Sequence, residues 1–295
     1  MSNYDKKYLI INADDFGVNE PTNRAIVELF ESKLITSSSL LTVAKNSEQA
    51  CDLSANQNFS LGVHLTLNSD TADDPWYSNS GAASLGGSSG LWYNQKRLAL
   101  KAKSSEVTEE LEAQYNFMIS HGIKPDHADS HCGTLYGING RLFFINAFKF
   151  CKKYSLPFRF PRNPDFLRRQ LNGKLPSVLK CIHAKIVSIA DKYEVLLPDD
   201  IITNPYSIKK IESYDNLRSH YLGELHALKS GISEIFMHPS YPLDSGTEGE
   251  WLKREFELRL LQSGDLLVEA KKQNIEICSW GDAPFNEVAG RQNYE

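Results

Sequence analysis

Short apolar runs alternate with amphipathic segments along most of the chain. The first run, Tyr8–Asn12, is typical of a strand, and Pro21–Ser32 is expected to follow as a helix with Asn19 as its N-cap. The same alternation predicts further strands at Thr36–Thr42, Ser60–Leu67, Pro125–Ser130, Leu156–Phe160, Glu234–His238 and Ile275–Trp280, and helices at Ser47–Ala55, Glu106–His121, Gly140–Tyr154 and Trp251–Leu261.

Repeating strand-then-helix units indicate an α/β fold with a parallel sheet and helices outside it. About seven or eight units fit a complete or imperfect TIM-like (β/α) barrel, and a doubly wound open sheet is the alternative. Two stretches, 70–93 and 162–230, interrupt the pattern, the second with helices expected at Ser177–Tyr193 and Ile208–Lys229. Long connections at the active face of a barrel usually build the substrate pocket, so both are interpreted as insertions in a single domain spanning 1–295.

Composition narrows the class of protein. The chain has 295 residues, is 41% hydrophobic and carries a formal net charge of -5 without a basic cluster, so we expect no nucleic-acid partner. Its five cysteines are scattered and form no Cys-x-x-Cys pair, which argues against a disulfide framework or a cysteine-held zinc. No apolar run reaches the ~18 residues of a membrane span or forms a signal peptide, so the expected location is the cytoplasm.

The first candidate chemistry is the pair Asp14 and Asp15, which directly follows the first strand. Successive strand side chains point to opposite faces, so one carboxylate could bind a metal while the other stands beside it as a base. Gly17 would allow a sharp turn there. In residues 61–67 the odd positions are apolar, and this alternation turns His64 towards the inside of a barrel.

A second group of polar side chains lies at 127–131. Alternation puts His127, Asp129 and His131 on one strand face, which would be costly in a dry core unless the side chains are paired or bind a metal. His131 is nearest the carboxyl end of the strand, where barrel active sites form. Asp129 is placed to orient a metal-binding side chain from behind, and His127 could do the same.

The ends of two later strands supply two further candidate residues. His238 is a candidate general acid, because its ordinary pKa lies near 6.5, and Arg159 could pair with a catalytic carboxylate. One carboxylate and two histidines form a sound set of three metal ligands, and a metal there would polarise a carbonyl and activate water. Asp14 could take the proton from that water, and His238 could protonate the leaving amine.

These residues resemble a known family. The strings Asn12-Ala-Asp-Asp-Phe-Gly17, Gly62-Val-His64-Leu and His127-Ala-Asp-Ser-His131, with His238-Pro239, are similar to signatures of the YdjC/ChbG carbohydrate deacetylases. The resemblance implies a distorted α/β barrel, removal of acetyl groups from N-acetylated sugars such as chitooligosaccharides, and one divalent metal ion, magnesium or zinc. It also favours a homodimer. By position it assigns Asp15, His64 and His131 as metal ligands, Asp14 as base, His238 as acid and Arg159 as the brace of the base.

The chain departs from the family pattern directly after His131. Cys132-Gly133 replaces the usual run of histidines, which leaves the identity of the sugar open, and we expect Cys132 to be a small buried filler. Three other functions stay open: a non-haem iron oxygenase, a metal-dependent sugar isomerase, and a sugar-binding barrel without catalysis. Release of acetate separates a deacetylase from all three.

Overall fold

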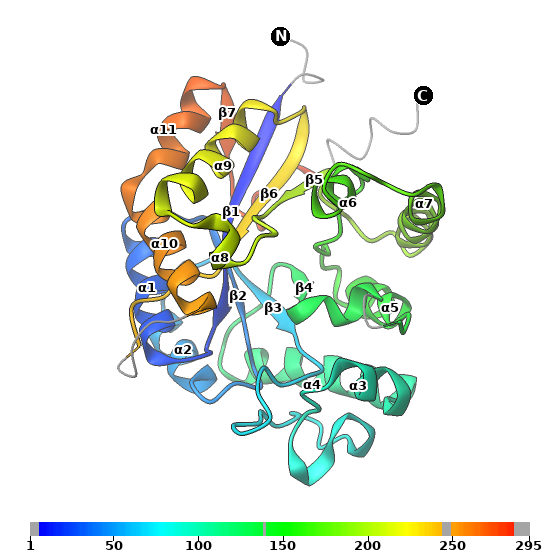
Figure 1. Ribbon diagram of the computed structural model, residues 1–295. Helices are drawn as coiled ribbons and strands as arrows, with labels where there is room; N and C mark the ends of the chain where they lie inside the picture. The colour runs from blue at the N-terminus through cyan, green and yellow to red at the C-terminus, as the bar shows by residue number, and fades with distance from the viewer. Residues whose placement is uncertain (1–5, 138–139, 244–248, 286–295) are drawn as a thin grey trace.

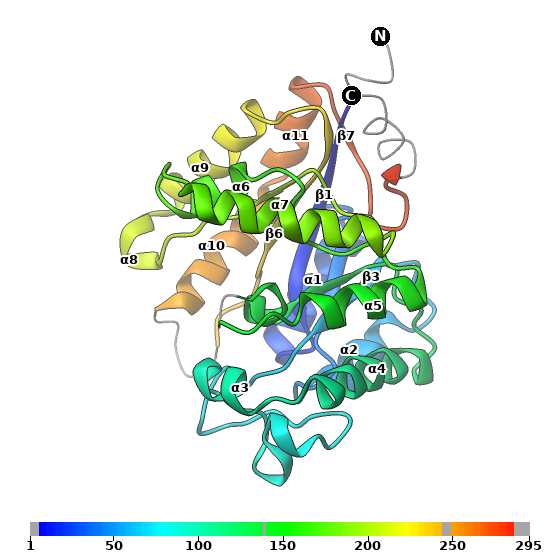
Figure 2. The ribbon, with the colours of Figure 1, turned by 90° about the vertical axis from the view of Figure 1, so that its right-hand side faces the viewer.

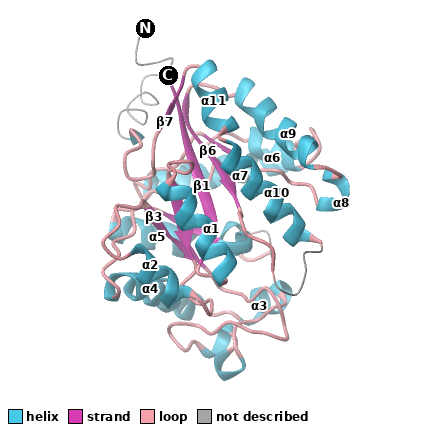
Figure 3. Cartoon of the chain, turned by 90° about the vertical axis from the view of Figure 1, so that its left-hand side faces the viewer, coloured by secondary structure: helices cyan, strands magenta, loops and turns pink. Residues whose placement is uncertain are grey.

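The computed structural model describes residues 6–137, 140–243 and 249–285, with parallel strands at the centre and helices around them (Figure 1, Figure 3). The strands of this part of the chain are β1 (Lys7–Phe16), β2 (Ser37–Leu40), β3 (Leu61–Leu65), β4 (Ala128–Ser130), β5 (Asp200–Ile202), β6 (Gly231–Met237) and β7 (Ile275–Ile277). Their order is β4-β3-β2-β1-β6-β5, and β7 pairs with the first residues of β1. Chain order and parallel pairing are those of a curled barrel sheet, so the predicted fold class is confirmed.

The helices connect successive strands over the outside of the sheet. They are α1 (Glu20–Glu31), α2 (Ser47–Ser54), α3 (Gln95–Lys101), α4 (Ser104–Ser120), α5 (Phe144–Tyr154), α6 (Asp165–Gln170), α7 (Ser177–Lys192), α8 (Ile208–Ile211), α9 (Tyr214–His226), α10 (Glu250–Ser263) and α11 (Asp265–Lys272). In Figure 1, α1, α2, α9, α10 and α11 lie along one side of the strands and α3 to α7 along the other. Figure 2 shows α5 and α7 crossing the face turned towards the viewer.

Hydrogen-bonded backbone continues the ring between β4 and β6. The amide of Arg159 donates to the carbonyl of Ala128 in β4 at 2.9 Å, and the amide of Phe158 donates to the carbonyl of Leu196 at 2.9 Å. The amide of Asp199 then donates to Ile232 in β6 at 2.7 Å. The segment 156–160 therefore stands where a barrel strand would, although the structure records only one isolated bridge there, Ala128 with Phe158.

The expected strand Leu156–Phe160 was thus wrong in extent, and its sequence gives a reason. Pro157 and Pro161 flank Phe158, and neither can donate a backbone hydrogen bond, so a regular ladder cannot extend in either direction. The sequence analysis also missed β5, which lies inside 162–230 and pairs with β6. In the same stretch the expected helix Ile208–Lys229 is divided into α8 and α9 at Glu212, which has a φ of 65°.

Other expectations for local structure are confirmed. Asn19 caps α1 by accepting a hydrogen bond from the amide of Thr22 at 2.9 Å. The odd residues of β3, including Leu61 and Val63, belong to the main apolar core under the helices, while His64 is buried on the opposite face. No helix in the described residues has the length and apolar character needed to cross a membrane.

The inside of the barrel is layered along its axis. Tyr8 and Ile10 of β1 form a small apolar cluster with Ile232, Trp280 and Phe285 at the amino ends of the strands. Two and four residues further along β1, Asn12 and Asp14 continue the same face among buried polar side chains. This apolar layer closes one end of the barrel, so the polar side chains gather at the carboxyl ends, where barrel active sites form.

Candidate active site

A backbone irregularity at the end of β1 brings two adjacent carboxylates into one site. Regular alternation would turn Asp15 outward with Ile11 and Ala13. Instead the register of β1 against β2 shifts between Ala13 and Phe16, and Asp15 has a φ of 68°. Left-handed backbone is uncommon for a residue other than glycine and is typical of functional sites. Asp14 and Asp15 therefore contact different partners at the same end of the barrel.

Three buried side chains from different strands converge at this point. The His64 Nε2 atom lies 3.4 Å from Asp15 Oδ1 and 3.2 Å from His131 Nδ1, and the His131 Nδ1 atom lies 3.4 Å from the same carboxylate oxygen. Asp15 Oδ1 is buried without a hydrogen-bond partner among the described residues. Ligands at ~2.0–2.1 Å from a tetrahedral zinc ion are themselves ~3.3 Å apart. The spacing and the unpaired oxygen both fit a divalent cation between the three atoms.

A carboxylate holds the far nitrogen of each imidazole. His64 Nδ1 lies 2.6 Å from Asp129 Oδ1, and His131 Nε2 lies 2.7 Å from Asp70 Oδ1. Such contacts fix the orientation of metal-binding histidines and increase their basicity. Asp129 was predicted in this position. Asp70 was missed, because a single aspartate in a Ser- and Gly-rich loop gives no signal in the sequence.

Arg159 is the centre of a buried ionic network below this cluster. It donates to both oxygens of Asp14 at 2.7 and 2.8 Å and to both oxygens of Glu234 at 2.8 Å, and its Nη2 lies 2.9 Å from Asp129 Oδ2. Sequence reasoning predicted the contact with a catalytic carboxylate but missed Glu234. The signal was available, because Glu234 is the one charged residue in the mostly apolar run of β6.

His238 reaches the site from the end of β6. Its Nε2 atom lies 3.8 Å from Asp14 Oδ2, and its amide donates to Glu257 Oε2 of α10 at 2.7 Å. The other ring nitrogen, Nδ1, lies 3.7 Å from the same oxygen of Glu257. The imidazole is thus held between a carboxylate at the site and another on α10, and part of it remains exposed.

The electrostatics of the cluster follow from burial and close charges. Burial alone would raise the pKa of Asp15, but Arg254 and the imidazoles of His131 and His64 hold it well below its usual value. Burial likewise disfavours charged His64, yet Asp129 and Asp15 raise its pKa to about 10. Protons and a metal ion therefore compete for the same imidazole nitrogen.

Arg254 of α10 is a further residue that sequence reasoning missed. Its Nη2 donates to Asp15 Oδ2 at 2.6 Å, while Asp15 Oδ1 faces the two imidazoles. The guanidinium also lies over the ring of Trp251, 4.7 Å from its centroid. An arginine in an amphipathic helix is indistinguishable in sequence from one facing solvent.

His127 and Cys132 lie at different distances from the cluster. His127 is stacked on Trp280 with centroids 4.8 Å apart, and its Nε2 lies 3.2 Å from Ser39 Oγ, which donates to Asp129 Oδ2 at 2.5 Å. His127 therefore reaches Asp129 through Ser39 and does not itself contact either imidazole of the cluster. Cys132 is exposed, so the expected buried filler was wrong. Its backbone is left-handed, with a φ of 49°, and its Sγ lies 3.3 Å from His131 Nε2.

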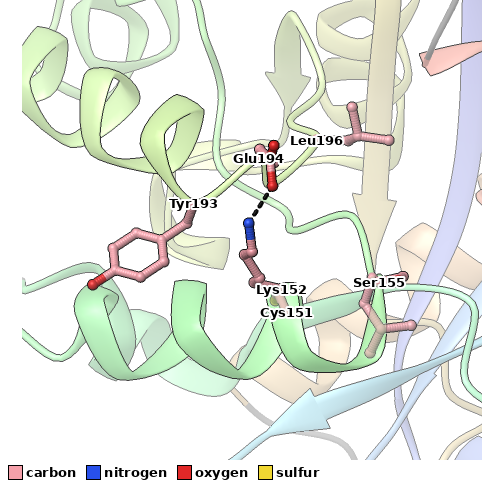
Figure 4. Close-up of a pocket in the computed structure, with 7 residues that line it drawn as sticks. Cys151, Lys152, Ser155, Tyr193, Glu194 and Leu196 are labelled. Atoms are coloured by element: carbon pink, nitrogen blue, oxygen red, sulfur yellow. Dashed lines mark hydrogen bonds and ion pairs between the residues drawn. The ribbon is translucent and has the colours of Figure 1, made fainter.

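A hollow of about 450 Å³ lies elsewhere, between the ends of α5 and α7 (Figure 4). It is lined by Cys151, Lys152, Ser155, Leu156, Tyr193, Glu194 and Leu196, and the ion pair of Lys152 with Glu194 spans it. None of the predicted site residues lines it, so it is separate from the cluster at the strand ends.

Fold and cluster together define the class: an α/β-barrel protein with a candidate cation centre at the carboxyl ends of its strands. A family model described as YdjC-like protein matches residues 8–269. The chain belongs to the YdjC-like family, and the predicted resemblance is confirmed.

Similar proteins with known descriptions are found over the same region. A carbohydrate deacetylase of Clostridium beijerinckii is 26% identical over 93% of this chain and 99% of its own length. A carbohydrate deacetylase of Enterococcus faecalis is 34% identical, over 54% of this chain and 59% of its own length. A solved structure from Enterococcus faecalis V583, described with a proposed role in cellobiose-phosphate cleavage, is 23% identical with a TM-score of 0.73 over 93% of this chain and 98% of that chain. This last likeness supports the fold.

Proposed function

We propose that this chain is a metal-dependent hydrolase that removes the acetyl group from an N-acetylated carbohydrate. The observation that carries the proposal is the convergence of Asp15 Oδ1, His64 Nε2 and His131 Nδ1 at 3.2–3.4 Å, with the carboxylate oxygen unpaired among the described residues. The descriptions of relatives as carbohydrate deacetylase and, in Proteus mirabilis, as chitooligosaccharide deacetylase support the same substrate class.

The charges around the cluster favour a divalent cation. Asp15, Asp70 and the three carboxylates in contact with Arg159 contribute five negative charges, while Arg159 and Arg254 contribute two positive ones. A bound divalent ion would offset most of the difference and would polarise the acyl carbonyl and lower the pKa of a nearby water. Mixed nitrogen and oxygen ligands at tetrahedral spacing favour zinc, and magnesium is the alternative.

The remaining steps are assigned to residues of the chain. Asp14, fixed by Arg159, takes a proton from the attacking water as the water oxygen bonds to the amide carbon. His238 gives a proton to the nitrogen as the carbon–nitrogen bond breaks, which releases acetate and the free amine of the sugar. The 3.8 Å between His238 Nε2 and Asp14 Oδ2 would place base and acid on the same reacting group.

An acetate-release assay over N-acetylated mono- and oligosaccharides, with zinc or magnesium added to chelator-treated protein, tests the proposal. Asp15→Asn should lose the metal, whereas Asp14→Asn should retain it and lose at least ~100-fold in rate. Asp191→Asn, which alters an exposed ion pair with Arg162, is the control. Full activity in Asp14→Asn would remove it as the base.

The same assay separates the alternatives. Conversion of an aldose to a ketose without acetate would favour an isomerase. Sugar binding that Asp14→Asn leaves unchanged, with no turnover under any metal, would favour a binding protein.

A further inference from the structure

The guanidinium of Arg254 uses one of its two terminal nitrogens, Nη2, to hold Asp15, and the other, Nη1, has no partner among the described residues. Its Nη2 donates to Asp15 Oδ2 at 2.6 Å, but its Nη1 is buried and has no hydrogen-bond partner within the described ranges 6–137, 140–243 and 249–285. A buried unpaired donor is rare in a folded protein, and it is costly when the group carries a charge. This nitrogen therefore calls for a partner that the described residues do not supply.

The position of Nη1 is set by that of Nη2. Both nitrogens share one carbon, and Nη2 contacts the very carboxylate whose other oxygen, Oδ1, lies 3.4 Å from His64 Nε2 and from His131 Nδ1. Nη1 thus lies at the rim of the metal cluster. The Trp251 ring, 4.7 Å from the guanidinium carbon, supports the group from one side.

We propose that Arg254 Nη1 binds the acyl oxygen of the substrate, and afterwards a carboxylate oxygen of the acetate product, while Nη2 holds Asp15 so that Oδ1 alone faces the cation. The proposal rests on the deacetylase function proposed above. In amide hydrolysis the carbonyl oxygen gains negative charge as water adds to the carbon, and a fixed positive donor beside that oxygen stabilises the charge. Arginine is suited to both tasks because its planar fork offers two donors at once.

The helix that carries Arg254 also contacts the proposed acid, His238. Glu257, three residues later on the same face of α10, accepts the hydrogen bond from the His238 amide at 2.7 Å. The one helix thus contacts a proposed metal ligand through Arg254 and the proposed acid through Glu257. The helix thereby fixes the distance between Arg254, which would bind the acyl oxygen, and His238, which would donate the proton.

Arg254→Lys separates the two tasks, because an ammonium can still reach Asp15 but has no second arm at the Nη1 position. In zinc- or cobalt-loaded protein we expect its metal affinity, from cobalt(II) absorbance titration, to stay within about threefold of wild type. Its acetate affinity, from calorimetry, should fall at least about tenfold and kcat about 100-fold, the size typical of a lost oxyanion donor. Arg254→Gln should in addition weaken metal binding about 10- to 100-fold.

Arg259→Gln, on the exposed face of the same helix over Tyr214, is the matched control and should leave all three quantities unchanged. Acetate affinity and kcat in Arg254→Lys equal to those of the control would overturn the proposal, as would the absence of acetate binding by metal-loaded wild type. If wild type binds acetate through Arg254 but releases none from any N-acetylated sugar, the deacetylase function fails and the anion-binding role stands.

Discussion

Two halves of the candidate site differ in how they are built. One half, Arg159 with Asp14, Asp129 and Glu234, lies on or between strands, and all its side chains are at most 3% exposed. The other half, formed by Asp70, His238 and Arg254, lies on loops and a helix with side-chain exposures of 36%, 32% and 16%. The strand half has every charge paired and fixes the geometry. The loop and helix half keeps solvent access and, among the described residues, an unpaired donor on Arg254, as contact with a substrate requires.

The largest effect is expected from replacing Arg159, the residue at the centre of the strand half. Arg159→Gln leaves three buried carboxylates without their counter-charge, and breaking such a network costs roughly 3–5 kcal/mol of unfolding free energy. Urea unfolding measures this loss. Arg168→Gln, which removes an exposed pair with Asp165, should cost at most about 1 kcal/mol. Equal losses in the two variants would show that the network does not support the fold.

A second experiment compares the two carboxylates that orient the imidazoles. Asp129→Asn and Asp70→Asn should each weaken metal binding by about 10- to 100-fold. Only Asp129→Asn should also destabilise the fold, by roughly 3 kcal/mol, because Asp129 is also paired with Arg159 in the interior. Chelator competition and thermal unfolding on both variants test the difference. Comparable destabilisation by Asp70→Asn would remove the distinction between the halves.

The loop that carries Asp70 has its own anchor. Buried Glu110 of α4 accepts hydrogen bonds from the amides of Asn79 and Ser80 at 3.0 and 2.9 Å, and from the Ser78 hydroxyl at 2.5 Å. Glu110→Gln replaces an acceptor by a donor and should cost about 1–3 kcal/mol.

The loss of stability in Glu110→Gln should be concentrated in residues 70–93. We expect faster proteolysis within this loop and a raised KM for the substrate. Glu109→Gln, on the exposed side of α4, is the control. Unchanged cleavage within the loop would mean that other contacts anchor it.

The smallest effect is expected at Cys132. Its thiol lies 3.3 Å from His131 Nε2, but Asp70 already holds that nitrogen at 2.7 Å. Cys132→Ser should change the affinity for zinc less than about threefold, because the stronger contact remains. A larger loss in a zinc titration would show that the thiol takes part in binding the metal.

Apart from Glu234, which was missed, the strand half could be predicted from sequence because strand periodicity places side chains. Alternation turned Asp129, and with it the proposed metal ligand His64, to the inside of the barrel, and position at a strand end indicated Arg159. The proposed metal ligand Asp15, which belongs to neither half, is an exception to this periodicity. Alternation alone would turn it outward, and its inward position depends on the φ of 68°, which a period-two pattern does not contain.

In the loop and helix half, only His238, which directly follows β6, could be predicted in this way, and Asp70 and Arg254 could not. Asp70 reaches His131 across 61 residues of sequence, and Arg254 reaches Asp15 across 239. Both contacts depend on tertiary packing. For the same reason β5 was missed: three residues flanked by loops have too little periodicity to stand out.

Anomalous diffraction from zinc-loaded crystals tests the proposed metal centre most directly. We predict one strong peak within ~2.0–2.2 Å of Asp15 Oδ1, His64 Nε2 and His131 Nδ1. The absence of a peak there, or a peak instead between Asp70, Cys132 and the other nitrogen of His131, would contradict it.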